Sequence, residues 1–393
     1  MKKVAFSAFS AFSALLLASG CVADEVKHTA LEEKVLHEEI TTSRVVMENE
    51  FLSVSFFPEL SGGVQNVVWK KDNLPLLRGG KYVRISEGPL LVRPAATGVL
   101  FFEKFWAASN VGLTAMEVKK QSDNYVELFA PIYDIQPASL TRKVTLAPGS
   151  LIVNFDVELL LQPGTRYVST NGIRPWLNLL TSQEIQWQVA IPGKGGAQVN
   201  GMGQKTDFPA TGIYRTGAFG PNTFFTPARN WVAVSSKENN ISLALIHDVE
   251  KTCTIYSWYG LHEGKTARTI EFIFPDPAAK LTDDRRYSYR MAIFPGIGDL
   301  REICQDTAIE PIRKDGSLTL RFSPARVVKG QKLSVKVAAN GKSIVLKGCD
   351  EVPELKPGKL FDALFELPAE FAQGKISVTW GEHSFTLLEE VIQ

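Results

Sequence analysis

The chain contains few of the residues that build metal sites and disulfide frameworks. It has five His, five Met and four Cys among 393 residues, and no pair of cysteines has the C-x-x-C spacing of a zinc or redox site. The chain also has no large excess of charge of either sign, because it contains 43 Lys plus Arg and 42 Asp plus Glu. A nucleic-acid binder normally carries a basic excess, so we expect no nucleic-acid partner. Long helical periodicity is absent, which disfavours a helical protein.

Apolar and aromatic residues are plentiful. Hydrophobic residues make up 45% of the chain, with 23 Phe, 9 Tyr and 7 Trp. This composition excludes wholesale disorder, and the aromatic enrichment is typical of a large β protein. The length allows two or three domains of roughly 150 residues, although one all-β unit can itself use about 250.

Residues 1–20 have the features of an export signal. A short basic M-K-K segment precedes an apolar run over residues 4–17, which is shorter than the roughly 20 residues that span a bilayer. The run ends in L-A-S-G-C, which resembles a bacterial lipobox except that Ala18 stands where Leu is usual. We expect lipidation of Cys21, a tether over residues 21–43, and membrane attachment through the lipid anchor in the bacterial cell envelope, at the periplasm or outer membrane. An ordinary cleaved signal with an incidental cysteine is the alternative.

Three further cysteines, Cys253, Cys304 and Cys349, follow the lipobox cysteine. Three thiols cannot all pair, and the sequence does not identify which two would form a bridge. Buried, inert thiols are the alternative interpretation of each.

From about residue 44 to residue 298, apolar runs recur at short intervals and are separated by turn residues. Strands are predicted at 45–47, 51–57, 64–69, 125–133, 140–146, 151–161, 231–235, 241–247, 253–259, 269–274 and 287–294. The G-K-G-G run at 193–196 lacks the spacing of a phosphate-binding loop and is expected to be an ordinary loop. Residues 44–298 therefore form one large antiparallel β unit in this interpretation.

A short helical connector is expected over residues 299–315. Its helix would span Asp299 to Thr307 and place Leu300, Ile303 and Cys304 on one face. From residue 316 to residue 393, apolar alternation at 318–322, 333–337 and 376–380 surrounds the hairpin dipeptide Asn340-Gly341. This pattern predicts a small immunoglobulin-like β-sandwich.

The segment E-N-E-F-L-S-V at 48–54, followed by P-E-L-S-G-G-V at 58–64, resembles the first hairpin of galactose mutarotase-like (aldose 1-epimerase-like) proteins. Further pieces follow in the family's order: R-P-W-L-N-L at 174–179, W-V-A-V at 231–234, T-I-E-F at 269–272 and F-P-G at 294–296. The resemblance covers residues 44–298 and is greatest to uncharacterised cell-envelope members. It implies an all-β fold, a β-supersandwich, with carbohydrate as the ligand.

Sugar mutarotation needs a base for the anomeric hydroxyl and an acid for the ring oxygen. The resemblance implies that Glu271 is the base, but Arg174 stands where the family has its acid histidine. Arginine stays protonated up to about pH 12 and cannot exchange a proton at neutral pH, so His247 is the alternative acid. A fixed guanidinium suits a carboxylate or a sulfate, which favours an acidic or sulfated sugar. Structural roles, as a salt bridge for Arg174 and a solvent-facing strand position for Glu271, are the alternatives.

Aromatic rings stack on the C–H faces of pyranoses, so Trp176, Trp258 and Tyr259 are candidate substrate-binding residues, with Asn178 and His262 as polar neighbours. Core packing is the commoner role of such rings in a β protein. No metal and no other cofactor is expected.

Three functions fit these observations: an exported carbohydrate-binding protein of the cell envelope, a sugar epimerase acting on envelope or polysaccharide-derived sugars, and a non-catalytic periplasmic assembly protein. An enzyme needs Glu271 and a titratable acid within about 10 Å of each other across one sugar ring. An assembly protein would present an exposed apolar patch instead. Fold alone does not decide among the three.

Overall fold

The computed structural model of the protein describes residues 44–58, 62–78, 82–84, 92–94, 100–105, 116–132, 138–161, 173–180, 187–200, 202–215, 222–248, 254–262, 265–273 and 285–391. Across these ranges the regular elements are β-strands and one 3₁₀ helix, η4 (Ala369–Phe371). In the same ranges, no helix has the length and apolar character needed to cross a membrane. The predicted all-β class is confirmed. The expected signal peptide, the tether and Cys21 lie outside the described residues.

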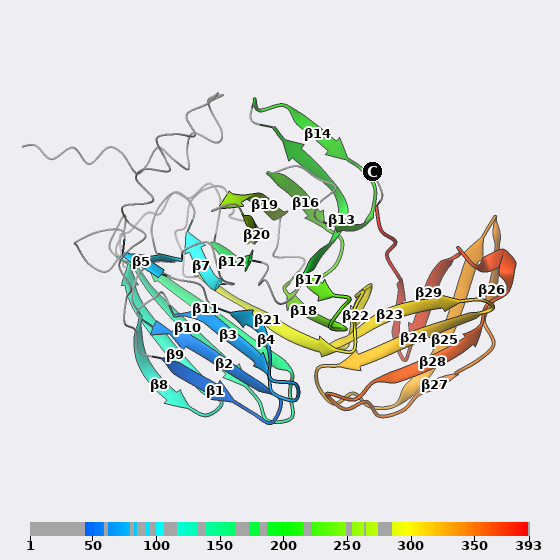
Figure 1. Cartoon of the computed structure of the whole chain (residues 1–393), viewed down its shortest axis with the longest axis horizontal. Helices are drawn as coiled ribbons and strands as arrows, with labels where there is room; N and C mark the ends of the chain where they lie inside the picture. The colour runs from blue at the N-terminus through cyan, green and yellow to red at the C-terminus, as the bar shows by residue number, and fades with distance from the viewer. Residues whose placement is uncertain are drawn as a thin grey trace, which may run out of the picture.

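The first unit is one long antiparallel ladder that curls back on itself (Figure 1). Its strands are β1 (Val45–Glu48), β2 (Leu52–Phe57), β3 (Gly63–Trp69), β4 (Leu74–Arg78), β7 (Leu100–Phe105), β8 (Glu117–Ser122), β9 (Tyr125–Ile132), β10 (Ala138–Leu146), β11 (Ile152–Leu161), β12 (Ile173–Leu180), β13 (Gln188–Val199), β14 (Lys205–Phe208), β15 (Gly212–Arg215), β16 (Thr223–Pro227), β17 (Trp231–Ser236), β18 (Ile241–Ile246), β19 (Thr254–His262), β20 (Lys265–Ile273) and β21 (Arg285–Pro295), beside a separate pair, β5 (Tyr82–Arg84) and β6 (Val92–Pro94).

Hydrogen-bonded neighbours give the strand order of this unit. The ladder runs β1–β2–β3–β7–β12–β20–β19–β16–β13, and from β13 it continues through β17–β18–β21–β11–β10–β9–β8. The bridging strand β13 pairs with β16 through its C-terminal half and with β17 through its first residues. Strand β13 thereby connects the part of the sheet that contains β16 to the part that contains β17.

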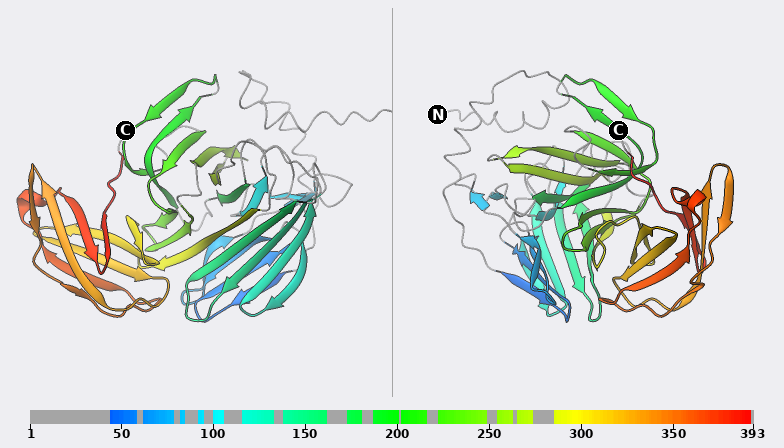
Figure 2. Two further views of the ribbon diagram at one scale, coloured as in Figure 1. Left: turned by 180° about the vertical axis from the view of Figure 1, so that it is seen from behind. Right: turned by 45° about the vertical axis from the view of Figure 1, so that its right-hand side comes forward.

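The two ends of the ladder form two layers, β1–β4 against β8–β11 and β21 (Figures 1 and 2). Val54 on β2 and Val144 on β10 are both fully buried in the same core. Successive strand residues point to opposite faces, and this period of two puts one apolar face of each layer inside. Each fully buried Val, Leu or Phe contributes about 1.5–3 kcal/mol to folding stability. The shared core therefore stabilises the curved shape of the sheet.

Asn49, in the E-N-E-F-L-S-V segment, links the two layers through hydrogen bonds of its side chain. Its side-chain Oδ1 accepts the backbone N–H groups of Phe51 and Leu52, both at 2.9 Å, which shapes the turn into β2. Its Nδ2 donates to the carbonyls of Ala147 at 2.9 Å and Ser150 at 2.7 Å, in the turn between β10 and β11. One amide thus satisfies four backbone groups from two layers, which explains the Asn in this segment.

The glycine run at 193–196 is part of strand β13 and not the loop expected from its composition. The register shifts between Gly193 and Gly196, which marks a bulge opposite β16. A Cβ on Gly195 (φ +142°) would lie 2.6 Å from the carbonyl oxygen of Phe208, and one on Gly196 would lie 2.8 Å from the ring of Phe225. The glycines therefore allow β14 and β16 to approach β13 closely.

The second unit is a sandwich of two sheets, as the apolar alternation predicts. One sheet has the order β22–β23–β24–β28, and the other has the order β26–β25–β29–β30 with β27 also paired to β25. Its core includes Phe322, Phe365 and Trp380. The strands are β22 (Glu302–Cys304), β23 (Thr307–Lys314), β24 (Ser317–Pro324), β25 (Gln331–Ala339), β26 (Lys342–Val345), β27 (Glu351–Val352), β28 (Phe361–Glu366), β29 (Lys375–Trp380) and β30 (His383–Thr386).

The helical connector predicted over 299–315 is wrong. Residues 302–304 and 307–314 are strands of a tight hairpin, and the first sheet of the second unit therefore begins at Glu302. Gln305 and Asp306 both take positive φ, +51° and +58°, which a helix does not allow. The Asp306 carboxylate is held by Arg290 and Arg326, at 2.6 and 2.7 Å. These long-range ion pairs favour the turn over the helix that local apolar spacing suggested.

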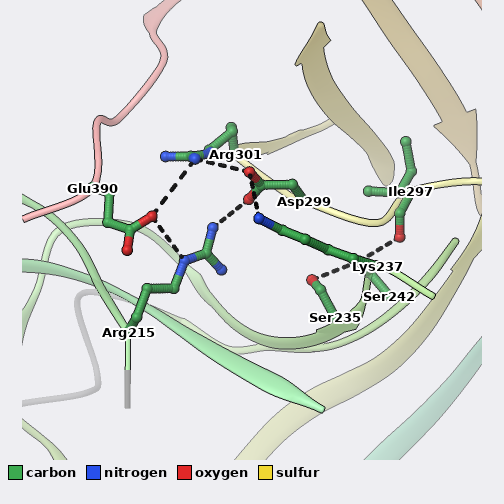
Figure 3. A network of polar contacts seen from close by, with 8 residues as sticks. All are labelled: Arg215, Ser235, Lys237, Ser242, Ile297, Asp299, Arg301 and Glu390. Carbon is green, nitrogen blue, oxygen red and sulfur yellow. Dashed lines mark hydrogen bonds and ion pairs between the residues drawn. The ribbon is translucent and has the colours of Figure 1, made fainter. Parts of the chain in front are cut away.

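Carboxylates of this junction pair with cations, several of which come from the first unit. Asp299 contacts Arg215, Arg301 and Lys237 (Figure 3). Burial alone would raise the pKa of Asp299, but the three cations outweigh it and the pKa is lowered. The packing of the two units against each other is thus fixed partly by charge.

Glu302 makes the most buried of these contacts. Its Oε2 lies 2.7 Å from Nε of Arg229, and its Oε1 accepts the indole N–H of Trp231 at 3.1 Å. Burial raises the pKa of Glu302, although Arg229 favours the charged form. Arg229 also donates to the carbonyl of Thr386 at 2.9 Å, which brings the end of β30 to the first unit.

The C-terminal tail, residues 387–391, returns to the first unit (Figure 1). The N–H of Ile213 on β15 donates to the carbonyl of Glu389 at 2.8 Å, and the N–H of Val391 donates to the carbonyl of Ile213 at 2.9 Å. Glu390 lies 3.6 Å from Nε of Arg215 (Figure 3). The tail therefore forms a parallel β-bridge to β15.

Candidate functional site

Strands β7, β12, β20, β19 and β16 lie side by side in that order, and their register aligns the predicted sugar residues. Glu271 on β20 pairs with Trp176 on β12 on one side and with Tyr256 on β19 on the other. Trp176 pairs with Phe102 on β7, and Tyr256 pairs with Phe224 on β16. Residues paired across an antiparallel ladder share a face of the sheet. We call these five positions the aromatic row.

Tyr256 and Phe224, the members of the row whose burial is described, are less buried than their neighbours along the strand. On β19, Ile255 is buried beside Tyr256, which is half-buried. On β16, Phe225 is buried in the same way beside the half-buried Phe224. Since neighbouring residues alternate between faces, the core lies behind the row and the row occupies the other side.

Tyr256 and Phe224 form a fixed pair of rings at one end of the row. Their ring centroids lie 4.7 Å apart with an angle of 33° between the planes. The Tyr256 hydroxyl donates to Oδ1 of Asn222 at 2.6 Å. Asn222 has a φ of +62°, a left-handed conformation that Asn tolerates better than most residues. The polar end of the ring is thus satisfied, while its apolar body lies half-buried on the sheet.

The register brings Arg174 and Asn178 to the same face as Trp176, because all three are two residues apart on β12. Arg174 pairs with Lys104 on β7, so two cationic positions face each other there. Asn178 pairs with Thr269 on β20. Arg174 and Glu271 therefore occupy positions on one face of the sheet. The side chains of β7, β12 and β20 lie outside the described part, so their contacts stay predictions.

The other predicted contacts on β19 divide between the two faces. Trp258 pairs with Thr269 and shares the parity of Tyr256, whereas Tyr259 pairs with Arg268 on the opposite face. The two neighbours therefore cannot both belong to the row. His262 pairs with Lys265 at the tip of the hairpin, six residues from Tyr256. This separation is about 20 Å along a strand.

His247 lies outside the five strands that carry the row. It follows β18, is 4% exposed, and donates its backbone N–H to the carbonyl of Asn230 at 2.7 Å. Strand β18 pairs with β17 and β21 and not with β20. Burial lowers the pKa of His247 to about 4, against the opposing effect of Asp248. A histidine that is neutral and buried at neutral pH does not suit the general-acid role considered for it.

Sequence reasoning missed Tyr256, Phe224 and Asn222. They stand in ordinary strand and loop segments, T-I-Y-S-W-Y at 254–259 and P-N-T-F-F at 221–225, with no motif that marks them. Only the pairing of β19 with both β20 and β16 aligns them with Glu271. Counting in steps of two from Trp258 would have identified Tyr256 as a neighbour on its face.

Within the described ranges, no three His, Cys, Asp or Glu side chains gather in a way that could hold a metal ion. Cys304 and Cys349 are free thiols, and Cys253 lies outside the described residues. Burial, together with the charges of Glu302 and Asp306, raises the pKa of Cys304 to about 12. This thiol is therefore a poor nucleophile at neutral pH.

Comparison with known proteins finds resemblance in solved structures. No family model and no curated protein matches the chain. A protein of Synechocystis sp. PCC 6803, Slr1438, has 12% identity and a TM-score of 0.49, over 65% of this chain and 96% of its own. A galactose mutarotase-like protein from Lactobacillus casei has 12% identity and a TM-score of 0.42, over 64% of this chain and 100% of its own.

A galactose mutarotase related enzyme from Lactobacillus acidophilus has 8% identity and a TM-score of 0.47, over 66% of this chain and 100% of its own. Two of these three solved structures are described as galactose mutarotase-like or galactose mutarotase related. The likeness concerns the fold, and any activity of this chain has to be argued from its own residues.

Proposed function

We propose that the protein binds carbohydrate on the face that carries the aromatic row. The observation that carries the proposal is the register of β12, β20 and β19, which aligns Trp176, Glu271 and Tyr256. Aromatic rings offer an apolar surface for the C–H face of a pyranose, and a carboxylate accepts hydrogen bonds from its hydroxyls. A row of rings with a carboxylate among them combines both requirements of sugar recognition.

Binding is better supported than epimerisation. A mutarotase needs an acid opposite its base, within reach of the same sugar ring. His262 is about 20 Å along the strand from the level of Glu271. The buried His247 follows β18, a strand that does not pair with β20. Arg174 shares the face but keeps its proton at neutral pH.

The preferred ligand is an acidic or sulfated sugar. Arg174 and Lys104 are cross-strand partners on the face of the row. Like charges directly opposite each other destabilise an antiparallel pair, unless an anion neutralises them. A uronate or a sulfate would provide that anion, and a guanidinium can hold either with two parallel hydrogen bonds. Two cations beside an aromatic row therefore favour an anionic glycan.

We place the protein in the bacterial cell envelope, exported and anchored through lipidated Cys21. The support is the basic, apolar and small-residue order of residues 1–21. Metabolic labelling with a fatty-acid analogue tests this: wild type becomes labelled, and Cys21→Ser does not. Equal labelling of both proteins would refute the anchor.

A glycan array that carries neutral, uronic and sulfated sugars tests the binding proposal. Wild type is expected to bind acidic glycans, and Arg174→Ala and Trp176→Ala are expected to lose that binding. Arg286→Ala is the matched control, because Arg286 on β21 is an exposed arginine that pairs with Glu158, outside the five strands of the row. If wild type binds no glycan, the proposed function is wrong. If Arg174→Ala binds as wild type does, the role of Arg174 is wrong.

A further inference from the structure

The aromatic row is longer than one sugar ring. It crosses five strands, from Phe102 on β7 to Phe224 on β16, with four intervals between strands. At about 4.8 Å per interval the row extends about 19 Å across the sheet. Four of its five positions are aromatic, and the fifth is Glu271. A single pyranose beside Glu271 would not reach the aromatic positions at the two ends of the row.

The pair Tyr256–Phe224 lies at the β16 end of the row, beyond Glu271 from Trp176. Both side chains are half-buried, while Thr223, Phe225 and Ile255 next to them are buried. Rings whose only role was core packing would be expected on the buried face with these neighbours. Part of each of these side chains therefore remains exposed to solvent.

Contacts within the protein hold the two rings of the pair in place. Phe224 packs against the ring of Tyr256 at 4.7 Å, and the hydrogen bond to Asn222 holds the hydroxyl of Tyr256. An interaction surface that is already ordered loses little side-chain entropy on binding, which favours affinity. Because the hydroxyl has its own acceptor, the surface left to a ligand is mainly apolar. That surface suits the C–H face of a sugar ring.

We propose that the aromatic row binds an extended carbohydrate chain that lies across the strands, with Tyr256 and Phe224 forming a second sugar subsite beyond the one at Trp176 and Glu271. This inference rests on the proposed function and adds the size of the ligand to it. The protein then distinguishes an oligosaccharide from a monosaccharide by the number of sugar rings that contact the aromatic row. A free single sugar is a weak ligand, and a chain of several units is a strong one.

Isothermal titration with two ladders, oligogalacturonides and cello-oligosaccharides of one to four units, tests the subsite. For wild type, affinity for the ladder that binds is expected to rise at least about tenfold between one unit and three, the equivalent of about 1.4 kcal/mol. Tyr256→Ala and Phe224→Ala are expected to lose this gain and keep wild-type affinity for the single sugar. Thr206→Ala is the control, because Thr206 is exposed on β14, outside the strands of the row.

Two further variants separate a lost subsite from a lost fold. Tyr256→Leu keeps apolar volume at the position but removes the ring, and it is expected to lose the gain with chain length. Tyr256→Phe keeps the ring and is expected to retain most of the gain. Equal affinity of wild type for all lengths overturns the extended site and leaves the proposed function standing. An absence of binding to both ladders overturns both proposals.

Discussion

Replacing Glu302 by Ala is expected to destabilise the protein by about 3 kcal/mol. The Glu302 carboxylate is 3% exposed and accepts hydrogen bonds from Nε of Arg229 at 2.7 Å, the indole of Trp231 at 3.1 Å and the N–H of Ile303 at 3.1 Å. Truncation leaves the N–H of fully buried Trp231 without this acceptor, at a cost of about 1–3 kcal/mol. Breaking a buried ion pair costs about 3–5 kcal/mol. Arg229 is 27% exposed, so water offsets part of that loss and the lower end applies.

Urea unfolding followed by tryptophan fluorescence measures this change. Glu354→Ala is the control, because Glu354 is exposed, pairs with Lys356 at 3.3 Å, and should change stability by less than about 0.5 kcal/mol. A double-mutant cycle with Arg229→Ala should give a coupling energy above about 1 kcal/mol. A loss below about 1 kcal/mol for Glu302→Ala would refute the importance of this contact to the packing of the two units.

Three other outcomes are expected. The lowered pKa of Asp299 means that its charge stabilises the fold above its ordinary pKa of 3.8 and that this stability is lost as the pH falls through the lower folded value. Asp299→Asn should therefore flatten the acid limb of a urea-midpoint profile against pH, and an unchanged limb would contradict it. Gly348→Ala should cost about 2–3 kcal/mol in thermal unfolding, because φ is +153° and the added Cβ would lie 2.2 Å from the carbonyl of Leu364, whereas Gly316→Ala, with open space around it, should cost about 1 kcal/mol. Native Cys304, with its pKa raised to about 12, should resist iodoacetamide at pH 8 and react once unfolded, and equal rates by peptide mass spectrometry would argue against its burial.

Most strand positions could be predicted from the sequence. The predicted strands at 64–69, 151–161 and 287–294 fall within or next to Gly63–Trp69, Ile152–Leu161 and Arg285–Pro295. Asn340 and Gly341 take positive φ, +52° and +75°, in the hairpin between β25 and β26, as their residue types require. Period-two burial and turn chemistry are local, so they can be recognised without knowing the partner strand.

Structural features that depend on residues far away in the sequence could not be predicted. The turn at Gln305 and Asp306 depends on Arg290 and Arg326, and local apolar spacing alone suggested a helix there. The glycines at 193–196 look like a loop until β14 and β16 are known to approach them. For the candidate site, the sequence offered Glu271 and Trp176 as separate candidates, and their alignment with Tyr256 and Phe224 depends on the register of four strands, β12, β20, β19 and β16.

Because the tail returns to β15, a label near the C-terminal end of the described chain probes the first unit and not the second. The tail passes from β30 to a parallel bridge at Ile213, so Val391 is beside the first unit although it follows the second in sequence. A fluorophore attached at position 391 would therefore sense the environment of β15. Pulling on that position in a force experiment would load the bridge at Ile213 before the small sandwich bears any tension.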